Sequence, residues 1–216
     1  MGRLSEIWDF DKNRIPTADS IKTALQNIGF DKIVFSENEL FKPKNIEINL
    51  GSLAKGFIVD KAVEFLQKNG IKKGIVNAGG DLRIFGYKKP LEIGIQHPRK
   101  KRNEIIAILK VKNKAVVTSG DYEQFFIIDG KRYHHILNPK TGFPAKTCVS
   151  VTVIASTALQ ADAFSTALFL LKPKSAIELA NKTPNLEAII YATENGSLVS
   201  YKSKNINQYL AVEYEK

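Results

Sequence analysis

Cysteine, methionine and tryptophan are scarce in this chain of 216 residues, which contains one of each. Because Cys148 is the single cysteine, no disulfide can form within the chain, and both oxidising and reducing compartments stay open. Long hydrophobic runs are absent too: stretches such as ALFLL are too short to span a bilayer, and the start MGRLSEIWDF lacks the apolar core of a signal peptide. We therefore expect the chain as written to be soluble.

Several common catalytic patterns are also missing. The histidines and the cysteine do not have the spacing of a zinc site, and no serine lies in the glycine-flanked turn of the α/β-hydrolases. The sequence has no internal repeat, low-complexity tract or clear linker, and its length suits one domain. We therefore expect a single domain over residues 1–216, without zinc or a serine triad.

Basic residues outnumber acidic ones by 32 to 22, which gives a formal net charge of +10. This excess favours anionic partners such as phosphates, acidic protein segments, nucleic acid or a membrane surface, without choosing among them. The densest basic cluster, HPRKKRNE from His97 to Glu104, has no interleaved aromatic residues and belongs to no helix that would enter a groove. We expect a solvated loop there and do not expect nucleic acid as a partner.

Hydrophobic periodicity predicts an α+β fold with mostly antiparallel strands. Helices are expected in IPTADSIKTALQNIGF, with Thr17 as its N-cap and Gly29 as its end, and in SLAKGFIVDKAVEFLQKNG, ALQADAFSTALFLL and KSAIELANK. Strands are expected between Gly, Asn, Asp or Pro turns. They are KIVF, ELFK, IEINL, GIVNA, DLRIFG, LEIGIQ, EIIAILKVK, AVVTS, QFFIID, RYHHIL, VSVTVIA, LEAIIYA and SLVSYK.

Paired glycines follow a predicted strand in NAGGDLRIFG, from Asn77 to Gly86. A dinucleotide-binding turn of the Rossmann type would open a helix on the pyrophosphate, whereas DLRIFG alternates like a strand. A β-turn explains Gly79 and Gly80 about as well as a ligand does. A ligand site remains the alternative interpretation, because Asp81 lies directly beside backbone that a bulky ligand could approach.

Asp162 is the only charged residue from Ala158 to Leu171, in a helix that is apolar nearly all round. A buried carboxylate is costly unless it is paired or binds a cation. Thr166 lies one helical turn further on the same face, so that a carboxylate and a hydroxyl oxygen converge as ligands suited to Mg²⁺. The alternative is that Asp162 holds a neighbouring loop through hydrogen bonds.

Two of the histidines are adjacent in TSGDYEQFFIIDGKRYHHILNPKTGFP, from Thr118 to Pro144. Strand periodicity sends His134 and His135 to opposite faces, so that at most one of them points into a cleft. A lone histidine is more often a packing residue than a catalyst. Histidine does exchange protons near neutral pH, however, and the flanking turns would hold this segment rigidly.

Taken in order, these segments resemble the ApbE family of FAD:protein FMN transferases, which move FMN from FAD to a threonine of a target protein. The matching motifs are LSEIWDF, INLGSLAKGFIVDKA, GIVNAGGDLRIFG, IGIQHP, VVTSGDYEQFF, YHHILNPKTGFP and SVTVIASTALQADAFSTALF. The resemblance implies an ApbE-like fold, Mg²⁺ as cofactor, FAD as substrate and AMP as the second product. It also implies an acceptor protein that carries the target threonine.

The resemblance further assigns residues to roles. It implies that Asp162 and Thr166 bind Mg²⁺ together with the backbone carbonyl of Ala54. It makes His135 the base for the target threonine, with His134 as the neighbour that faces away. It implies positions near flavin or phosphate, or in the cofactor pocket, for Lys55, Asn77, Gly79, Gly80, Asp81, Ser119, Gly120, Asp121 and Tyr122.

The chain departs from the family pattern at its start, where relatives usually have a further segment and often a lipoprotein signal that anchors them outside the cytoplasm. We therefore expect an N-terminally shortened form, natural or engineered, or half of a two-chain enzyme whose second chain supplies that segment. Asn49 and Asn138 stand where many members have aspartate, and each keeps a hydrogen-bonding side chain without the charge.

Two other functions remain open on the sequence. An FAD-binding protein or FAD pyrophosphatase would use the same pocket and metal but pass the phosphate to water, giving FMN and AMP. A non-catalytic domain would bind nucleic acid or a partner through its positive charge, with steep salt dependence and no flavin binding. For the transferase, we predict that His135→Ala abolishes transfer whereas His134→Ala largely spares it.

Overall fold

The computed structural model describes residues 2–101 and 103–214. The chain divides into two compact units, one formed by Met1–Leu50 with Glu123–Ala145 and the other by Gly51–Tyr122 with Lys146–Lys216. The expectation of a single domain over residues 1–216 stays a prediction.

Within the described residues, the second unit is built on a six-stranded antiparallel sheet with the order β12-β11-β10-β7-β4-β3. Strand β10 is buried along its whole length because it lies inside the sheet and both of its faces are covered. Each strand of this sheet coincides with a predicted one. They are β3 (Gly74–Ala78), β4 (Asp81–Phe85), β7 (Ala115–Gly120), β10 (Ser150–Ala155), β11 (Glu187–Glu194) and β12 (Ser197–Lys202).

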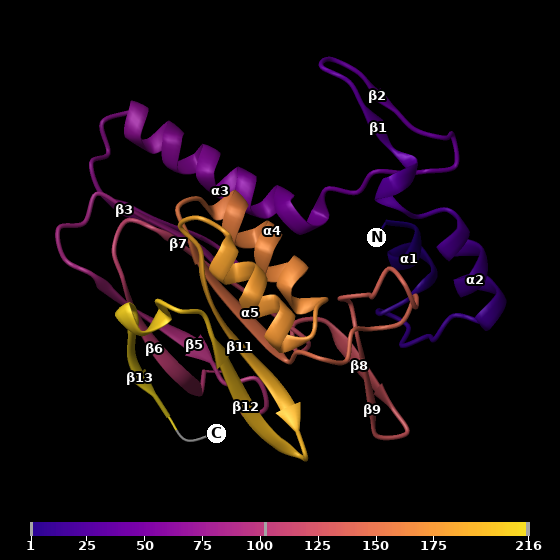
Figure 1. The fold of residues 1–216 in the computed structure, drawn as a ribbon. Coiled ribbons are helices and arrows are strands. Elements are labelled where there is room, and N and C mark those ends of the chain that lie inside the picture. Colours follow the sequence, from indigo (N-terminus) through magenta and orange to yellow (C-terminus); the bar gives the residue numbers. More distant parts are fainter. Residues whose placement is uncertain (1, 102, 215–216) are drawn as a thin grey trace. The chain divides into compact units, whose positions relative to one another are not determined.

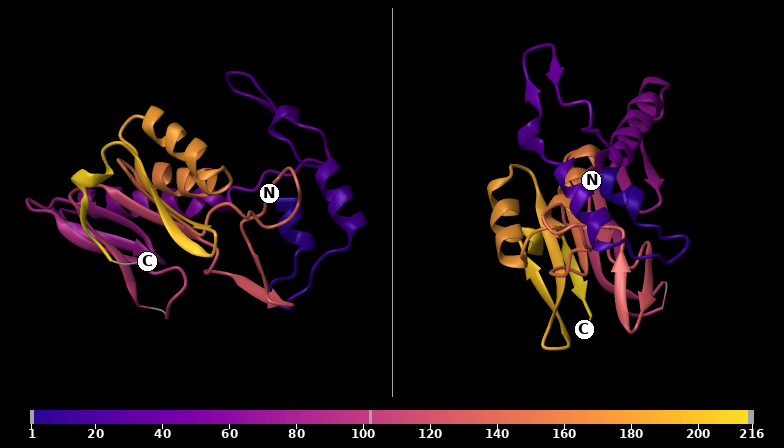
Figure 2. Two further views of the ribbon diagram at one scale, coloured as in Figure 1. Left: turned by 60° about the horizontal axis from the view of Figure 1, so that its bottom comes forward. Right: turned by 90° about the vertical axis from the view of Figure 1, so that its right-hand side faces the viewer.

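The helices of the second unit pack against one face of this sheet (Figures 1 and 2). They are α3 (Gly51–Lys68), α4 (Ala158–Phe169) and α5 (Pro173–Lys182). Helix α4 contacts β7 and β10, and α3 contacts α4 and β4. No helix among the described residues combines the length and the apolar character needed to cross a bilayer.

A smaller sheet with the order β13-β6-β5 contributes side chains to a hydrophobic core of the same unit. It consists of β5 (Leu91–Gln96), β6 (Ile105–Val111) and β13 (Leu210–Glu213), which follows a short 3-10 helix, η2 (Ile206–Gln208). The buried side chains of this core come from strands of both sheets, and full burial of each large apolar one stabilises the fold by about 1.5–3 kcal/mol. They include Ile84, Ile106, Leu109, Ile154, Ile189 and Tyr191.

The first unit is organised around Trp8, whose ring packs against Phe126 and Tyr133 and meets Phe143 edge to face. The indole N–H donates to the carbonyl oxygen of Gly142 at 2.9 Å, so the tryptophan holds the turn that follows the paired histidines. The elements of this unit are α1 (Gly2–Ile7), α2 (Ala18–Gln26), η1 (Phe30–Lys32), β1 (Val34–Phe35), β2 (Leu40–Phe41), β8 (Phe125–Ile128) and β9 (Lys131–His134).

One predicted strand of the first unit is wrong. IEINL, residues 46–50, forms no strand, although its apolar residues alternate. A turn begins the segment, with the N–H of Ile46 bonded to the carbonyl oxygen of Pro43. Ile46 is buried, but Ile48 and Leu50 are 45% and 57% exposed, so the alternation does not mark one buried face.

Cys148 lies in the second unit, where burial raises the pKa of its thiol to about 11. At pH 8 about one thiol in a thousand is then ionised, and the thiolate is the reactive form. We expect the folded protein to react with Ellman's reagent at least tenfold more slowly than the urea-unfolded protein at pH 8. Equal rates would show that this segment opens readily.

Candidate active site

The N-terminal part of α3 lies directly against α4. The backbone N–H of Gly56 donates a hydrogen bond of 2.8 Å to Oδ2 of Asp162. A Cβ at position 56 would lie 2.8 Å from the Cβ of Asp162 and closer still to the carbonyl oxygen of Ala158. Glycine therefore permits the close approach of the helices, and it places the turn that contains Ala54 and Lys55 beside the Asp162 carboxylate.

Asp162 is buried, with 6% of its surface exposed. Desolvation raises the pKa of its carboxyl group, while the hydrogen bond from Gly56 and the positive charge of Lys55 act in the opposite direction. Oδ2 accepts the hydrogen bond from Gly56, and no hydrogen bond within the described residues reaches Oδ1. Asp162 thus hydrogen-bonds to a neighbouring helix, whereas the alternative named a neighbouring loop, and its Oδ1 accepts no hydrogen bond from the described residues.

The close contact at Gly56 predicts that Gly56→Ala destabilises the protein. Alanine gains about 1 kcal/mol over glycine inside a helix, whereas overpacking costs about 1–3 kcal/mol and more where backbone must shift. Here the overlap is with backbone, so we expect a net loss of about 1–2 kcal/mol in the free energy of unfolding by urea. Glu64→Ala, on the exposed side of the same helix, is the control and should change stability by less than about 0.5 kcal/mol. An unchanged or increased midpoint for Gly56→Ala would contradict the packing.

Thr166 is held near β7 by a small group of hydroxyls. Ser119 Oγ lies 2.8 Å from Ser165 Oγ and 3.4 Å from Thr166 Oγ1. Ser165 donates its own proton to the carbonyl oxygen of Asp162 at 2.9 Å, so Ser119 is the donor in its bond with Ser165. Ser119 and Thr166, predicted from separate motifs, therefore lie together, and Ser165 joins them as a buried residue that the prediction missed.

Lys55 and Asp81 form an ion pair, with Lys55 Nζ 2.9 Å from Asp81 Oδ1. Asp81 is 1% exposed, whereas the Lys55 side chain is 49% exposed. The turn before Asp81 is closed by a 2.9 Å hydrogen bond from the N–H of Gly80 to Oδ1 of Asn77, and both Gly79 and Gly80 have positive φ, at 60° and 99°. The glycines thus serve a β-turn, which places Asp81 opposite Lys55.

Asp60 is a carboxylate that the prediction missed. Its two oxygens accept hydrogen bonds of 2.9 Å from the N–H groups of Ala158 and Leu159, the first residues of α4. Arg83 Nε lies 3.4 Å from one of them. Asp60 therefore caps the helix that carries Asp162, one helical turn after the Gly56 contact. Its spacing of four residues from Gly56 is the feature that could have pointed to it.

Asp121 is bound by Arg99 through two hydrogen bonds of 2.6 Å. His97 Nδ1 accepts from the N–H groups of Arg99 and Lys100, each at 3.1 Å, and so fixes the turn that carries the arginine. Burial lowers the pKa of His97, which suits a neutral ring that accepts two hydrogen bonds. The solvated loop expected here is therefore wrong for His97, which is buried, whereas Arg99 is exposed as expected although it pairs with Asp121. Arg102 lies outside the described residues.

Gly120 is the last residue of β7, and Tyr122 lies two residues further along the chain. Tyr122 Oη lies 3.5 Å from Ser150 Oγ, and a Cβ at Gly120 would collide with the tyrosine ring. Gly120 therefore gives the ring its place against the sheet. Asp121 and Tyr122 form a group with Arg99 and Ser150, apart from the hydrogen bonds that join Ser119 to α4.

The two adjacent histidines have different surroundings in the first unit. His134 is 3% exposed, its Nε2 lies 2.7 Å from the carbonyl oxygen of Ala145, and its Nδ1 accepts from the N–H of Ile136 at 3.3 Å. His135 is partly exposed, and its Nδ1 lies 3.3 Å from the carbonyl oxygen of Gln124. A carbonyl oxygen can only accept, so Nδ1 of His135 carries the proton in this hydrogen bond.

His135 lines a polar cavity of about 410 Å³ in the first unit. His134 does not line it, so the two side chains differ in access as strand periodicity predicts. The other lining residues are Ser5, Glu6, Trp8, Asp9, Phe10, Asp11, Arg14 and Gln124.

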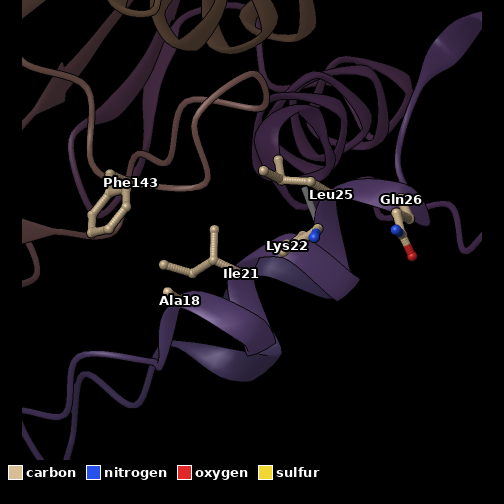
Figure 3. A pocket seen from close by; sticks show the side chains of 6 residues that line it. All are labelled: Ala18, Ile21, Lys22, Leu25, Gln26 and Phe143. Carbon is tan, nitrogen blue, oxygen red and sulfur yellow. The ribbon is translucent and has the colours of Figure 1, made fainter.

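An apolar groove of about 420 Å³ lies along α2 in the same unit (Figure 3). Ile21, Leu25 and Phe143 line it, together with Ala18, Lys22 and Gln26. It holds none of the residues to which the sequence assigns chemistry.

The structure thus joins several predicted site residues of the second unit in a series of contacts. Asp81 meets Lys55, the next residue Gly56 meets Asp162, and Thr166 meets Ser119. Across the part of the chain that the structure describes, no group of three or more His, Cys, Asp or Glu side chains could hold a metal ion. A cation at Asp162 would therefore depend on hydroxyl, carbonyl and substrate oxygens for its other ligands, which is usual for Mg²⁺.

Comparison with solved structures places this fold among flavin transferases. The crystal structure of the ApbE protein from Thermotoga maritima has a TM-score of 0.84 and 35% sequence identity, and the match covers 96% of this chain and 70% of that one. Flavin transferase ApbE from Vibrio cholerae has a TM-score of 0.83 and 28% identity, with 97% of this chain and 69% of that chain covered. These likenesses confirm the predicted α+β, mostly antiparallel, ApbE-like fold.

Sequence comparison identifies the family. The ApbE family model matches residues 1–190, so the chain belongs to the ApbE family. An FAD:protein FMN transferase of Treponema pallidum is 33% identical over 211 residues, and one of Klebsiella pneumoniae is 30% identical over 205. The matches cover 88% and 92% of this chain but 58% and 64% of those proteins, so the chain spans about three fifths of the length of these relatives.

Proposed function

We propose that this chain takes part in the Mg²⁺-dependent transfer of FMN from FAD to a threonine of an acceptor protein, with release of AMP. Family membership and the names of the relatives support the reaction class. The observation that carries the proposal is the Asp162 carboxylate, which is buried against the N-terminal part of α3 with Oδ1 left for a ligand.

The residues around Asp162 fit a hard cation. Asp162 Oδ1, the Thr166 hydroxyl and the carbonyl oxygen of Ala54 would hold Mg²⁺, which prefers oxygen ligands and also accepts phosphate oxygens. When bound, the ion would offset charge on the pyrophosphate of FAD. Ser119 supports this assignment, because its hydroxyl lies 3.4 Å from Thr166 Oγ1 and fixes that side chain.

His135 supplies the base in this proposal. With its proton on Nδ1, bonded to Gln124, the ring would take the proton of the threonine hydroxyl at Nε2. The threonine oxygen then attacks the phosphorus on the FMN side, a new P–O bond forms, and the P–O bond to AMP breaks. Lys55, half-exposed and paired with Asp81, would give its positive charge to the phosphates. The cofactor-pocket roles of Asn77, Gly79, Gly80, Gly120, Asp121 and Tyr122 belong to the same proposal.

We also propose a second polypeptide as a partner. It would supply the part that the relatives have outside the region matched by this chain. Large apolar side chains are exposed around the β1–β2 hairpin, and exposed apolar patches mark interaction surfaces. Phe30, Phe35 and Phe41 are 75%, 57% and 55% exposed. Adding the unmatched part of the Thermotoga maritima protein as a separate polypeptide should tighten FAD binding, and an unchanged affinity would contradict this part of the proposal.

The experiment that tests the reaction class measures the products from FAD. The chain is incubated with FAD and Mg²⁺, with and without an acceptor protein, and AMP and free FMN are quantified by chromatography. Transfer predicts AMP without an equal amount of free FMN, because the FMN remains on the acceptor. Equal amounts of AMP and free FMN would instead identify an FAD pyrophosphatase.

A further inference from the structure

We propose that the second unit carries a surface that binds membranes containing anionic phospholipids. Three segments that are distant in the sequence form this surface: residues 71–74 lead into β3, 86–90 join β4 to β5, and 111–115 run from the end of β6 to the start of β7. Together they contain six lysines, here called the lysine patch. These are Lys72, Lys73, Lys88, Lys89, Lys112 and Lys114. None of the six has a role in the proposed flavin transfer, so the two proposals are independent.

Close backbone contacts hold the three segments side by side. Gly86 has a φ of 74°, and a Cβ there would lie 1.8 Å from the carbonyl oxygen of Lys72, so the second segment touches the first. Asn113 joins the third segment to the second. Its Oδ1 accepts from the N–H of Tyr87 at 2.9 Å, and its Nδ2 donates to the Tyr87 carbonyl oxygen at 3.1 Å. The six lysines are therefore fixed together on one surface of the second unit.

The positive charge of the lysine patch is not neutralised within the described residues. The three segments contain no aspartate or glutamate, and none of the six lysines forms an ion pair with another described residue. Glu92, the nearest carboxylate along the chain, lies 3.8 Å from Lys110 of the neighbouring strand. All of the patch except Lys114 is exposed. Because like charges held together repel one another, an anionic surface brought against the patch is attracted to it.

An exposed apolar side chain beside the lysines favours a membrane as the anionic partner. Ile71, directly before Lys72, is 46% exposed. Its N–H donates to the carbonyl oxygen of Leu66 at 3.0 Å, which fixes its backbone at the end of α3. The boundary between lipid headgroups and acyl chains accepts both basic and apolar side chains, whereas the phosphates of a nucleic acid attract only the charges. Lysine also suits a surface without fixed shape, because its charge lies on a flexible stem.

The aromatic ring of the patch is poorly arranged for nucleic acid. Tyr87 is partly buried, and Lys73 Nζ lies over its ring, 5.8 Å from the centroid. Single-stranded nucleic acids stack their bases on open aromatic faces, and the lysine occupies one face of this ring. The three segments contain no helix that could enter a groove and no arginine for bidentate contacts with bases. A membrane surface requires none of these features.

Vesicle flotation tests the membrane assignment with the whole chain. The chain is mixed with vesicles of phosphatidylcholine alone, or of phosphatidylcholine with phosphatidylglycerol, at low and at high salt, and the floated fraction is measured. A lysine close to an anionic surface contributes a factor of about five in affinity. We therefore expect at least about tenfold stronger binding to the phosphatidylglycerol vesicles at low salt, and loss of most of this preference at high salt through screening.

Substitutions in the patch should weaken this binding. Lys88→Gln combined with Lys89→Gln should lower the affinity about tenfold, whereas Lys88→Arg combined with Lys89→Arg should retain it. Both side chains are exposed, so unfolding by urea should be unchanged. Ile71→Ser should lower vesicle binding severalfold, because it removes apolar surface and keeps every charge.

Lys172→Gln combined with Lys174→Gln is the matched control, with the same change of charge at the other end of the six-stranded sheet. These exposed lysines lie at the start of α5, near the beginning of β10, where Thr147 bonds to the carbonyl oxygen of Leu171. Ala155, the last residue of β10, instead pairs with the third segment of the patch. The control variant should therefore bind vesicles like the wild type.

No flotation with either kind of vesicle, equal flotation with both, or equal losses in the patch variant and the control would each overturn the proposal. Duplex DNA, added at the same phosphate concentration as the anionic lipid, provides a competition test. The chain should stay on the vesicles, and its release by DNA would assign the patch to nucleic acid and refute the membrane assignment. Because the assay contains no FAD, Mg²⁺ or acceptor, its result leaves the proposed flavin transfer to be decided separately.

Discussion

His135→Ala is expected to abolish FMN transfer, with a loss of about 10²–10⁴-fold in rate. The reason is the loss of the basic nitrogen that the Gln124 carbonyl orients through Nδ1. The measurement is initial-rate AMP release from FAD in the presence of Mg²⁺ and acceptor. Because the side chain is partly exposed, the variant should unfold at nearly the same urea concentration as the wild type.

His134→Ala is the matched control, and its rate per folded molecule should stay close to the wild-type rate. His134 is buried and bonded at both ring nitrogens, so its removal leaves the N–H of Ile136 without its acceptor and costs about 1–3 kcal/mol of stability. Rates must therefore be compared at a temperature at which both variants are folded. Equal losses in the two variants under that condition would refute the assignment of His135 as the base.

The second large effect is expected for Asp162→Asn, which should lower transfer by about 100-fold or more, since a metal ligand supports several kcal/mol of charge stabilisation. Asparagine keeps an oxygen that can accept from Gly56, so the contact between α3 and α4 is retained. Mg²⁺ at 100 times its dissociation constant should stabilise the wild type by about 2.7 kcal/mol. The variant should lose this stabilisation.

Thermal unfolding with and without Mg²⁺ measures this second effect apart from activity. Glu178→Gln, an exposed carboxylate on α5, is the control and should respond to Mg²⁺ like the wild type. If Asp162→Asn is stabilised by Mg²⁺ as much as the wild type, the ion binds elsewhere, and the ligand set of Asp162, Thr166 and Ala54 is wrong.

Local sequence patterns predicted the elements that are fixed by their own periodicity. Thr17 begins α2 by accepting from the N–H of Ser20, as its position before an amphipathic run predicts. The apolar runs in the central strands of the large sheet were equally informative, because a strand that is covered on both faces, such as β10, is buried along its whole length. In each case the residues that set the boundary lie within a few positions of one another.

Elements that depend on distant contacts were not predictable in the same way. Strand β13 (Leu210–Glu213) exists because it pairs with β6, about a hundred positions earlier, with an irregular register between Leu210 and Val212. IEINL shows the converse, since its alternation finds no partner strand among the described residues. A strand forms only with a partner strand, so the alternation within one segment cannot decide whether β13 or IEINL forms a strand.

In the candidate site, too, contacts between residues far apart in the sequence could not be predicted from local patterns. Sequence reasoning selected Asp162 because a lone carboxylate in an apolar helix needs a partner, and the structure gives it the N–H of Gly56, 106 positions earlier. It missed Asp60 and Arg99, whose partners are the start of α4 and Asp121. Arg99 was assigned to a solvated loop because it lies among other basic residues, and Asp60 was given no role because its partners, the N–H groups that begin α4, lie about a hundred positions later.

Covalent labelling of natural acceptors tests directly whether this chain transfers FMN to protein. Vibrio cholerae contains an FAD:protein FMN transferase that is 30% identical to this chain, so cells that lack that enzyme should accumulate unlabelled acceptors. Extracts of such cells are incubated with the chain, FAD and Mg²⁺, and tryptic peptides are analysed by mass spectrometry. We expect a threonine peptide heavier by one FMN group, with one AMP released for each label. Free FMN with AMP and no labelled peptide, or FAD left intact, would contradict this expectation.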